Sequence, residues 1–253
     1  MKEKIAIIGA GNMGQAIAQG LVRKKIVTKK QLICTNSQTN NNISACEKAD
    51  IIILAIKPQL SSDVLEEIKH VIKNQLIISI MAGISIGKME SILGSNKAII
   101  RSMPNLAAQT GNAMTAWVKN KNVSQKQEEI VKTILQTIGK EVFLKDEMQL
   151  NAVTAISGSG PAYFLYITEI LEQVGKQFGF SHDVVSILAK QTLIGSASLL
   201  EQSKKSPEEL RKSIMSKGGT TEAAFRIFAQ EDLSKIFIKG VKAAKARAEE
   251  LNQ

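Results

Sequence analysis

Three glycines near the N-terminus have the spacing of a loop that binds phosphate. Gly9, Gly11 and Gly14 form a G-x-G-x-x-G pattern directly after the apolar run at residues 4–8. In such a loop the first glycine permits a tight turn, the second lets the backbone approach a pyrophosphate, and the third lets the next helix pack on the strand. The N-terminus of that helix faces the anion. The pattern predicts a dinucleotide site rather than a purely structural turn.

The end of the second predicted strand bears on which dinucleotide binds. A site for NAD usually places Asp or Glu about 20 residues after the glycine loop, where the carboxylate binds the ribose hydroxyls. This chain has Thr35, Asn36 and Ser37 there, and the arginine that often binds a 2′-phosphate is also missing. Because Asn and Ser can hydrogen-bond a 2′-phosphate that a carboxylate would repel, NADP is the favoured cofactor and NAD the alternative.

Few other side chains offer acid–base or metal chemistry. His70 and His182 fall within predicted helices at no recognisable distance from a catalytic partner, and Cys34 and Cys46 lack the spacing of metal ligands. Spacing suggests neither an acid pair nor a Ser-His-Asp arrangement. We therefore expect no metal site, and the two isolated cysteines favour a reducing, cytoplasmic compartment.

Two clusters of small residues in the C-terminal half could bind a carboxylate. Residues 157–160 read Ser-Gly-Ser-Gly before Pro161, and residues 216–221 read Ser-Lys-Gly-Gly-Thr-Thr between two predicted helices. Backbone N–H groups at a helix N-terminus can bind an anion. Hydroxyl-rich loops also serve simply as helix caps, and these residues by themselves leave both interpretations open.

The elements that must position these residues fall into two groups. Up to about residue 144, short β-branched runs alternate with helical stretches, which is typical of a parallel sheet with crossover helices. The predicted strands are residues 4–8, 31–35, 50–56, 75–80, 97–103, 113–118 and 141–144, and the helices between them include residues 12–24, 59–73 and 124–138. We predict an α/β fold with a Rossmann-like dinucleotide-binding domain at residues 1–146 and an all-helical domain at residues 147–253.

Composition narrows the range of partners. The chain has 253 residues, 44% of them hydrophobic, and a formal net charge of +10. The basic residues are scattered without aromatic interleaving, so we expect a small anionic ligand and neither nucleic acid nor a membrane as partner. The broad apolar helix faces near Phe164 and Val174 favour a dimer, with a monomeric bundle as the alternative. We also expect no cleavable signal and no membrane span.

Five segments together resemble the pyrroline-5-carboxylate reductase family. They are GAGNMGQAIAQGL at residues 9–21, ADIIILAIKPQ at 49–59, IRSMPNLAAQTGNAMTA at 100–116, AVTAISGSGPAY at 152–163 and MSKGGTTEAA at 215–224. The resemblance implies hydride transfer from NAD(P)H to the C=N bond of 1-pyrroline-5-carboxylate to give L-proline, the last step of proline biosynthesis. It also implies a homodimer through the helical domain, often within a larger ring of dimers.

The resemblance further implies which residues form the site. Substrate would be bound by Ser216, Gly218, Gly219, Thr220 and Thr221, with the Thr221 hydroxyl nearest the ring nitrogen as the catalytic group. Together with the glycine pattern and the strand ending discussed above, it implies that the cofactor is bound by Ile8, Gly9, Ala10, Gly11, Asn12, Met13, Gly14, Asn36, Ser37, Asn42, Ala55, Ile56, Lys57, Pro58, Met81, Ala82 and Gly83.

The chain departs from the family pattern in three places. Residues 37–49 are shorter than the usual helix and strand beside the adenosine end of the cofactor, Leu106 stands in a segment that usually reads MPNTPA, and Lys217 replaces a usual proline. The shortened segment leaves open an NADP-binding paralogue with a sensing or structural role and little turnover. Another imine or β-hydroxyacid reductase of the same two-domain plan is a further alternative.

Overall fold

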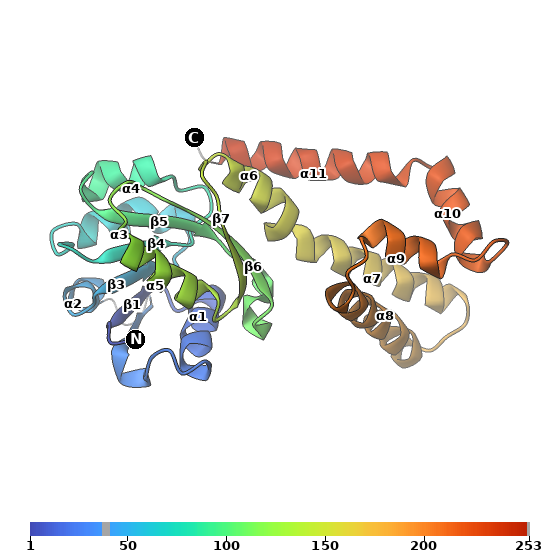
Figure 1. Ribbon diagram of the computed structural model, residues 1–253, viewed down its shortest axis with the longest axis horizontal. Helices are drawn as coiled ribbons and strands as arrows, with labels where there is room; N and C mark the ends of the chain where they lie inside the picture. The colour runs from blue at the N-terminus through green and yellow to red at the C-terminus, as the bar shows by residue number, and fades with distance from the viewer. Residues whose placement is uncertain (37–40, 252–253) are drawn as a thin grey trace. The chain divides into compact units, whose positions relative to one another are not determined.

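Packing divides the chain into two compact units. The computed structural model describes residues 1–36 and 41–251. The first unit contains Met1–Ser159 together with the residues from Ala244 onward, and the second contains Gly160–Ala243 (Figure 1). The first unit extends past the domain boundary expected at residue 146, because helix α6 (Gln149–Val153) buries Leu150 in the core beside the sheet.

A seven-stranded sheet forms the centre of the first unit. Its strands are β1 Ile5–Ile8, β2 Leu32–Thr35, β3 Ile51–Leu54, β4 Leu76–Ser79, β5 Ala98–Met103, β6 Ala113–Lys119 and β7 Gly139–Phe143. They lie in the order β2-β1-β3-β4-β5-β6-β7. Every residue of β1, β3 and β4 is buried, as expected for strands covered by helices on both faces. The Rossmann-like α/β fold predicted from the alternating pattern is confirmed.

Helices cover both faces of this sheet. They are α1 Asn12–Arg23, α2 Asn42–Glu47, α3 Ser61–Ile68, α4 Ile86–Leu93 and α5 Gln125–Leu135. Helices α1 and α5 bury their apolar residues on one face, and α2, α3, α4 and α6 bury theirs on the other (Figure 1). The three predicted helices, α1, α3 and α5, begin within two residues of their predicted positions, although α3 ends at Ile68, five residues before the predicted end.

The sheet is parallel from β2 to β5, and its direction reverses at β6. Strand β6 pairs antiparallel with β5, and β7 pairs parallel with β6. Residues 104–112 join β5 to β6 through a single 3₁₀ turn, Leu106–Thr110. A parallel connection needs a crossover of a dozen or more residues, so this short link forces the antiparallel arrangement.

The shortened segment between β2 and β3 keeps a helix. Helix α2 has six residues and buries Ala45 and Cys46 against the sheet. In the described part of this segment no strand separates β2 from β3 along the chain, so β2 is the edge strand of the sheet. The truncation therefore leaves the crossover helix in place, in reduced form.

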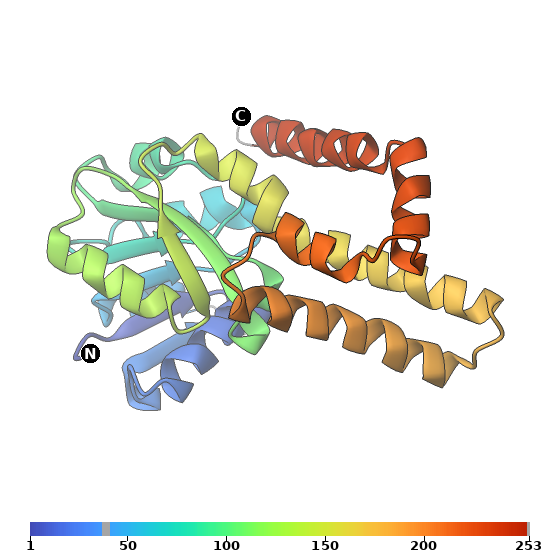
Figure 2. The same ribbon diagram turned by 45° about the vertical axis from the view of Figure 1, so that its right-hand side comes forward.

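The second unit is entirely helical in its described secondary structure. Its helices are α7 Gly160–Gln177, α8 His182–Gln202, α9 Pro207–Ile214, α10 Thr220–Gln230 and most of α11 Leu233–Glu250. Helices α7 and α8 lie side by side (Figure 2), and a Cβ on Gly175 of α7 would lie 2.2 Å from Val185 Cγ2 of α8. Ser206 caps α9 with Glu209 in a capping box, and Pro207 is the first helical residue.

Large apolar side chains remain exposed on this helical unit. Phe164, Tyr166 and Leu171 of α7, Ile187 of α8 and Ile236 of α11 are each at least 45% exposed. Among the described residues, α8 is the one helix long and apolar enough to cross a membrane. A single such helix is weak evidence for a span, since apolar helices of soluble proteins pass the same test.

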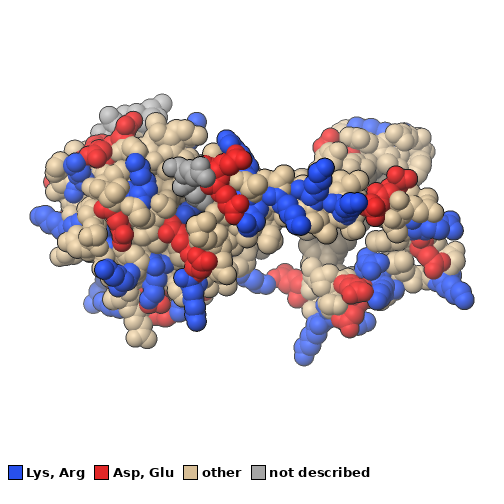
Figure 3. All heavy atoms as spheres, turned by 90° about the horizontal axis from the view of Figure 1, so that it is seen from above, with Lys and Arg blue, Asp and Glu red and all other residues tan. Residues whose placement is uncertain are grey.

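The charged side chains form no single basic surface on the face shown in Figure 3. Lys and Arg are interspersed there with Asp and Glu over the elements in view. This distribution gives an extended nucleic acid backbone no continuous basic track on that face.

Candidate functional site

The glycine loop requires glycine at its first and third positions for steric reasons. Gly9 has a φ of +102°, and a Cβ there would lie 2.5 Å from the carbonyl oxygen of Ala55. A Cβ on Gly14 would lie 2.1 Å from the carbonyl oxygen of Gly9. The tight turn and the close approach of α1 to β1 therefore both exclude a side chain.

Gly11 differs, because a side chain there would meet no protein atom within 4 Å. It is the N-cap of α1 in extended conformation, and no side chain caps the helix. The first N–H groups of α1, on Asn12 and Met13, have no acceptor within the helix, and the positive end of the helix dipole lies behind them. This geometry fits the pyrophosphate of a dinucleotide.

The end of β2 is held to the glycine loop by hydrogen bonds. The Thr35 carbonyl oxygen accepts from the backbone N–H groups of Gly9 (3.1 Å) and Ala10 (2.8 Å). The buried Thr35 hydroxyl donates to Asn42 Oδ1 at 2.7 Å, and Asn42 Nδ2 donates to Glu67 Oε2 at 2.9 Å. Asn36 is exposed beside this network, and Ser37 lies outside the described residues.

Glu67 of α3 is an acid near the end of β2 that sequence reasoning missed. It lies 32 residues after Thr35, so no spacing rule would find it. Asn42, which is 8% exposed, connects the two through both ends of its amide. In this arrangement Asn42 is a structural link between β2, α2 and α3, and its contact with cofactor remains a prediction.

The other predicted cofactor segments follow neighbouring parallel strands. Residues 55–58 come directly after β3, and residues 81–83 come shortly after β4. In-register pairing of β1, β3 and β4 brings these segments and the glycine loop to the same edge of the sheet. The Met81 side chain is buried in the core, so this residue can offer only its backbone to a ligand, and Gly83 has a φ of +75°.

A partly buried ion pair, also missed, joins β5 to the start of the helical region. Arg101 is 6% exposed, and its guanidinium donates to Glu147 Oε1 at 2.7 Å. The same oxygen accepts from the backbone N–H of Ile86 at the start of α4 (2.9 Å). Glu147 therefore fixes three segments of the first unit at once. The two residues are 46 positions apart, which is why spacing did not reveal them.

The Ser-Gly-Ser-Gly cluster lies at the junction between a π-helical turn and α7. Residues Thr154–Gly158 form a π-helical turn that follows α6 and precedes α7, so the chain is helical on both sides of it. The Ser159 N–H donates to the Thr154 carbonyl at 2.8 Å. Gly160, the last residue of the cluster, begins α7, and the Ser159 N–H is used within the helical run. Anion binding by this cluster stays a prediction.

The second small-residue loop does begin a helix. Gly219 is the N-cap of α10 without a side-chain cap, and Gly218 has a φ of +75°. A Cβ on Gly219 would lie 2.4 Å from Ser216 Oγ, so the turn is closed tightly on that hydroxyl. Thr220 and Thr221 form the first turn of α10. The Gly218 N–H donates to Glu222 Oε2 at 2.6 Å, so a carboxylate of the chain itself occupies this donor.

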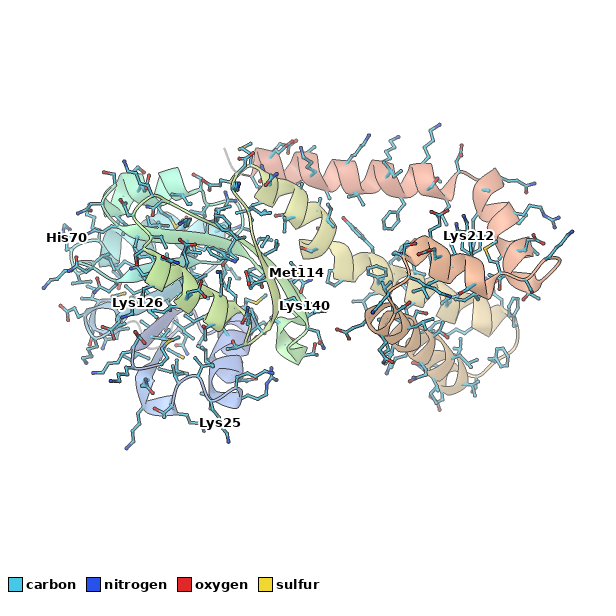
Figure 4. The ribbon with its side chains drawn as sticks, viewed as in Figure 1. Lys25, His70, Met114, Lys126, Lys140 and Lys212 are labelled. Carbon is cyan, nitrogen blue, oxygen red and sulfur yellow. The ribbon has the colours of Figure 1, made fainter. Side chains whose placement is uncertain are left out.

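Neither histidines nor thiols supply an evident reactive group. His70 projects from the surface of the first unit (Figure 4), and His182 is the exposed first residue of α8. Burial, with a smaller effect of the Glu67 charge, raises the pKa of the Cys46 thiol to about 12. No group of three or more His, Cys, Asp or Glu suited to a metal occurs within the described ranges.

Comparison with known proteins shows the family to which this chain is similar. A family profile described as "Pyrroline-5-carboxylate reductase dimerisation" matches residues 147–251, and one described as "NADP oxidoreductase coenzyme F420-dependent" matches residues 4–83. The pyrroline-5-carboxylate reductase of Pseudomonas aeruginosa is 34% identical over 98% of this chain and 96% of its own length. That of Vibrio alginolyticus is 32% identical over 99% and 98%.

Solved structures give the same result. Pyrroline carboxylate reductase of Plasmodium falciparum, solved with NADP bound, has a TM-score of 0.91 and 29% identity over 100% of this chain and 99% of its own. The Coxiella burnetii pyrroline-5-carboxylate reductase has a TM-score of 0.92 and 30% identity over 100% of both chains. The dimerisation region further implies that the chain forms a homo-oligomer. The chain therefore belongs to the pyrroline-5-carboxylate reductase family of NAD(P)H-dependent oxidoreductases.

Proposed function

We propose that this chain reduces 1-pyrroline-5-carboxylate to L-proline with NADPH as preferred reductant and NADH as the alternative. The observation that carries the proposal is the open space at Gly11 in front of the uncapped N-terminus of α1. The NADP preference is supported by Thr35 and Asn36 at the end of β2, where a site for NAD would carry a carboxylate.

The cofactor residues divide according to the parts of the dinucleotide. The N–H groups at the start of α1 bind the pyrophosphate, Asn36 and Ser37 the 2′-phosphate, and residues 55–58 and 81–83 the nicotinamide half. When bound, the reduced nicotinamide supplies the hydride. The protein's own task is then to hold the imine at the correct distance and orientation.

The loop at residues 216–221 binds the substrate. Its backbone N–H groups and hydroxyls bind the carboxylate of the pyrroline, as the Gly218 N–H already binds the carboxylate of Glu222. The protonated imine donates its N–H to the Thr221 hydroxyl oxygen. Hydride then adds to the imine carbon, and the nitrogen keeps its proton in the product. This chemistry needs no histidine base.

The helical domain, residues 147–253, joins two copies of the chain. Support comes from the exposed apolar residues of α7, α8 and α11 and from an apolar groove of about 310 Å³ lined by Tyr163, Ile167 and Phe237 among others. Association removes such surfaces from water. We further propose that the homodimers assemble into a larger ring and that the enzyme is soluble and cytoplasmic.

Mixing the purified chain with 1-pyrroline-5-carboxylate and NADPH or NADH tests the proposal. We expect loss of absorbance at the reduced nicotinamide band, faster with NADPH at equal concentration. Cofactor binding without oxidation of either reductant would contradict the enzymatic role and support the paralogue with a sensing function. Faster turnover with NADH would contradict only the cofactor preference.

A further inference from the structure

Asn105 lies beyond the carboxyl ends of the parallel strands, as the proposed cofactor segments do. It follows β5 by two residues, and β5 continues the parallel, in-register series β1, β3 and β4. Strands in a sheet are about 4.8 Å apart, so the end of β5 lies roughly 14 Å from the glycine loop, three strands away. The end of β5 lies on the opposite side of the glycine loop from β2, where the adenosine end is proposed to bind.

The orientation of the Asn105 amide is determined by the helical run that contains Pro161. Proline has no N–H, so it cannot donate to the carbonyl oxygen four residues earlier, which is that of Ser157. Asn105 Nδ2 donates to this oxygen instead, at 2.9 Å. The hydrogen bond requires the nitrogen of the amide to face Ser157, which assigns the other side of the amide to Oδ1.

Asn105 Oδ1 is buried and has no hydrogen-bond partner among the described residues. A buried carbonyl oxygen without a partner is unfavourable, since it has lost its water without gaining a donor. The oxygen therefore requires a donor from a ligand or from bound water. At this end of the dinucleotide the cofactor itself carries one, namely the N–H₂ of the nicotinamide carboxamide.

We propose that Asn105 binds the nicotinamide carboxamide, its Oδ1 accepting a hydrogen bond from the carboxamide N–H₂. The inference rests on the proposed function, because it takes the edge of the sheet as the cofactor site. The bond sets the rotation of the nicotinamide ring about its glycosidic bond and hence the face it presents to substrate. Pro161 and Ser157 act as positioning residues, because they hold the Asn105 amide in this orientation.

Binding measurements with three nucleotides test the assignment on the full-length chain. NADP⁺ carries the carboxamide, 3-acetylpyridine adenine dinucleotide phosphate has a methyl ketone in its place, and 2′-phospho-ADP-ribose lacks the ring. We expect the wild-type chain to bind NADP⁺ about 3- to 10-fold more tightly than the acetylpyridine analogue, the effect of one hydrogen bond. In Asn105→Ala this ratio should fall to about one, with the Kd of 2′-phospho-ADP-ribose unchanged.

Asn112→Ala is the matched control, because Asn112 is exposed after the same 3₁₀ turn and donates only a long 3.4 Å bond to Thr110. It should keep the wild-type ratio. An equal ratio in wild type and Asn105→Ala would overturn the assignment, as would a wild type that does not distinguish the two dinucleotides. If wild type failed to bind even 2′-phospho-ADP-ribose, both the assignment of Asn105 and the proposed cofactor site would be contradicted. Normal binding of that truncated nucleotide by Asn105→Ala shows that the variant is folded.

Discussion

Thr221 is half-buried in the first turn of α10, next to the loop that binds the Glu222 carboxylate. If its hydroxyl accepts the N–H of the protonated imine, Thr221→Ala should lower kcat/KM for 1-pyrroline-5-carboxylate by about 10- to 150-fold, corresponding to roughly 1.5–3 kcal/mol. The Kd of NADPH, measured by fluorescence titration, should not change. Thr221→Ser keeps the hydroxyl and is the control. An unaltered kcat/KM in the alanine variant would refute the role of Thr221.

Glu222 places a negative charge on the loop that is proposed to bind the substrate carboxylate. Its Oε2 accepts from the Gly218 N–H, so the two carboxylates compete for one donor and repel each other. Glu222→Gln should therefore lower the KM for 1-pyrroline-5-carboxylate by about 2- to 5-fold, the range of an exposed charge interaction.

Steady-state kinetics at low ionic strength, where screening is weakest, measure this change. Glu231→Gln, at the other end of α10, removes the same charge far from the loop and should leave the KM unchanged. A higher KM in Glu222→Gln would mean that the carboxylate supports the loop conformation more than it opposes the substrate.

At the scale of elements, two glycines of the β1–α1 connection have different roles. We expect Gly14 to be needed for folding and Gly11 to be needed for cofactor binding. A Cβ on Gly14 would lie 2.1 Å from the Gly9 carbonyl oxygen, whereas a Cβ on Gly11 would meet no protein atom within 4 Å. Gly14→Ala should lower the free energy of unfolding by about 1–3 kcal/mol, as overpacking does. Gly11→Ala should unfold at the wild-type urea concentration and weaken NADPH binding by about tenfold, since its methyl group occupies the pyrophosphate space.

Urea denaturation measures the free energy of unfolding of both variants, and titration with NADPH measures their cofactor binding. The prediction for Gly11 would be contradicted if the alanine variant bound NADPH as well as wild type does. That result would place the pyrophosphate elsewhere than in front of α1.

Element order was predictable because it depends on local patterns. All seven strands form where apolar, β-branched runs predicted them. The π-helical turn at Thr154–Gly158 was not predictable, because small residues are as common in loops as in irregular helices. The reversal at β6 follows from the length of a single connection, which the alternating pattern does not reveal.

At the scale of the whole molecule, the helical domain exposes apolar side chains that a partner copy would cover. Ile236 of α11 is 64% exposed and lines the apolar groove with Tyr163 and Phe237. Ile236→Glu should shift the protein from dimer toward monomer, because burying an unpaired carboxylate in an apolar interface is unfavourable. Light scattering over a dilution series measures the shift.

Ile43→Glu on α2 is the control, since Ile43 is 42% exposed but belongs to the first unit. It should keep the wild-type mass. A dimer of unchanged stability in Ile236→Glu would exclude this groove from the interface.

The sequence by itself determined those features of the fold and site that depend only on residues close together along the chain. The glycine loop after β1, the lack of an acid at Thr35 and Asn36, and the helix start at Gly219 could all be read from short segments, and the family could be inferred from five of them. Only the tertiary structure showed that Glu67 is connected to Thr35 through Asn42, that Glu147 pairs with Arg101, and that Asn105 donates to the Ser157 carbonyl. These contacts join residues 25 to 52 positions apart. These contacts form only when strands and helices pack together, so a local pattern of residues cannot predict them.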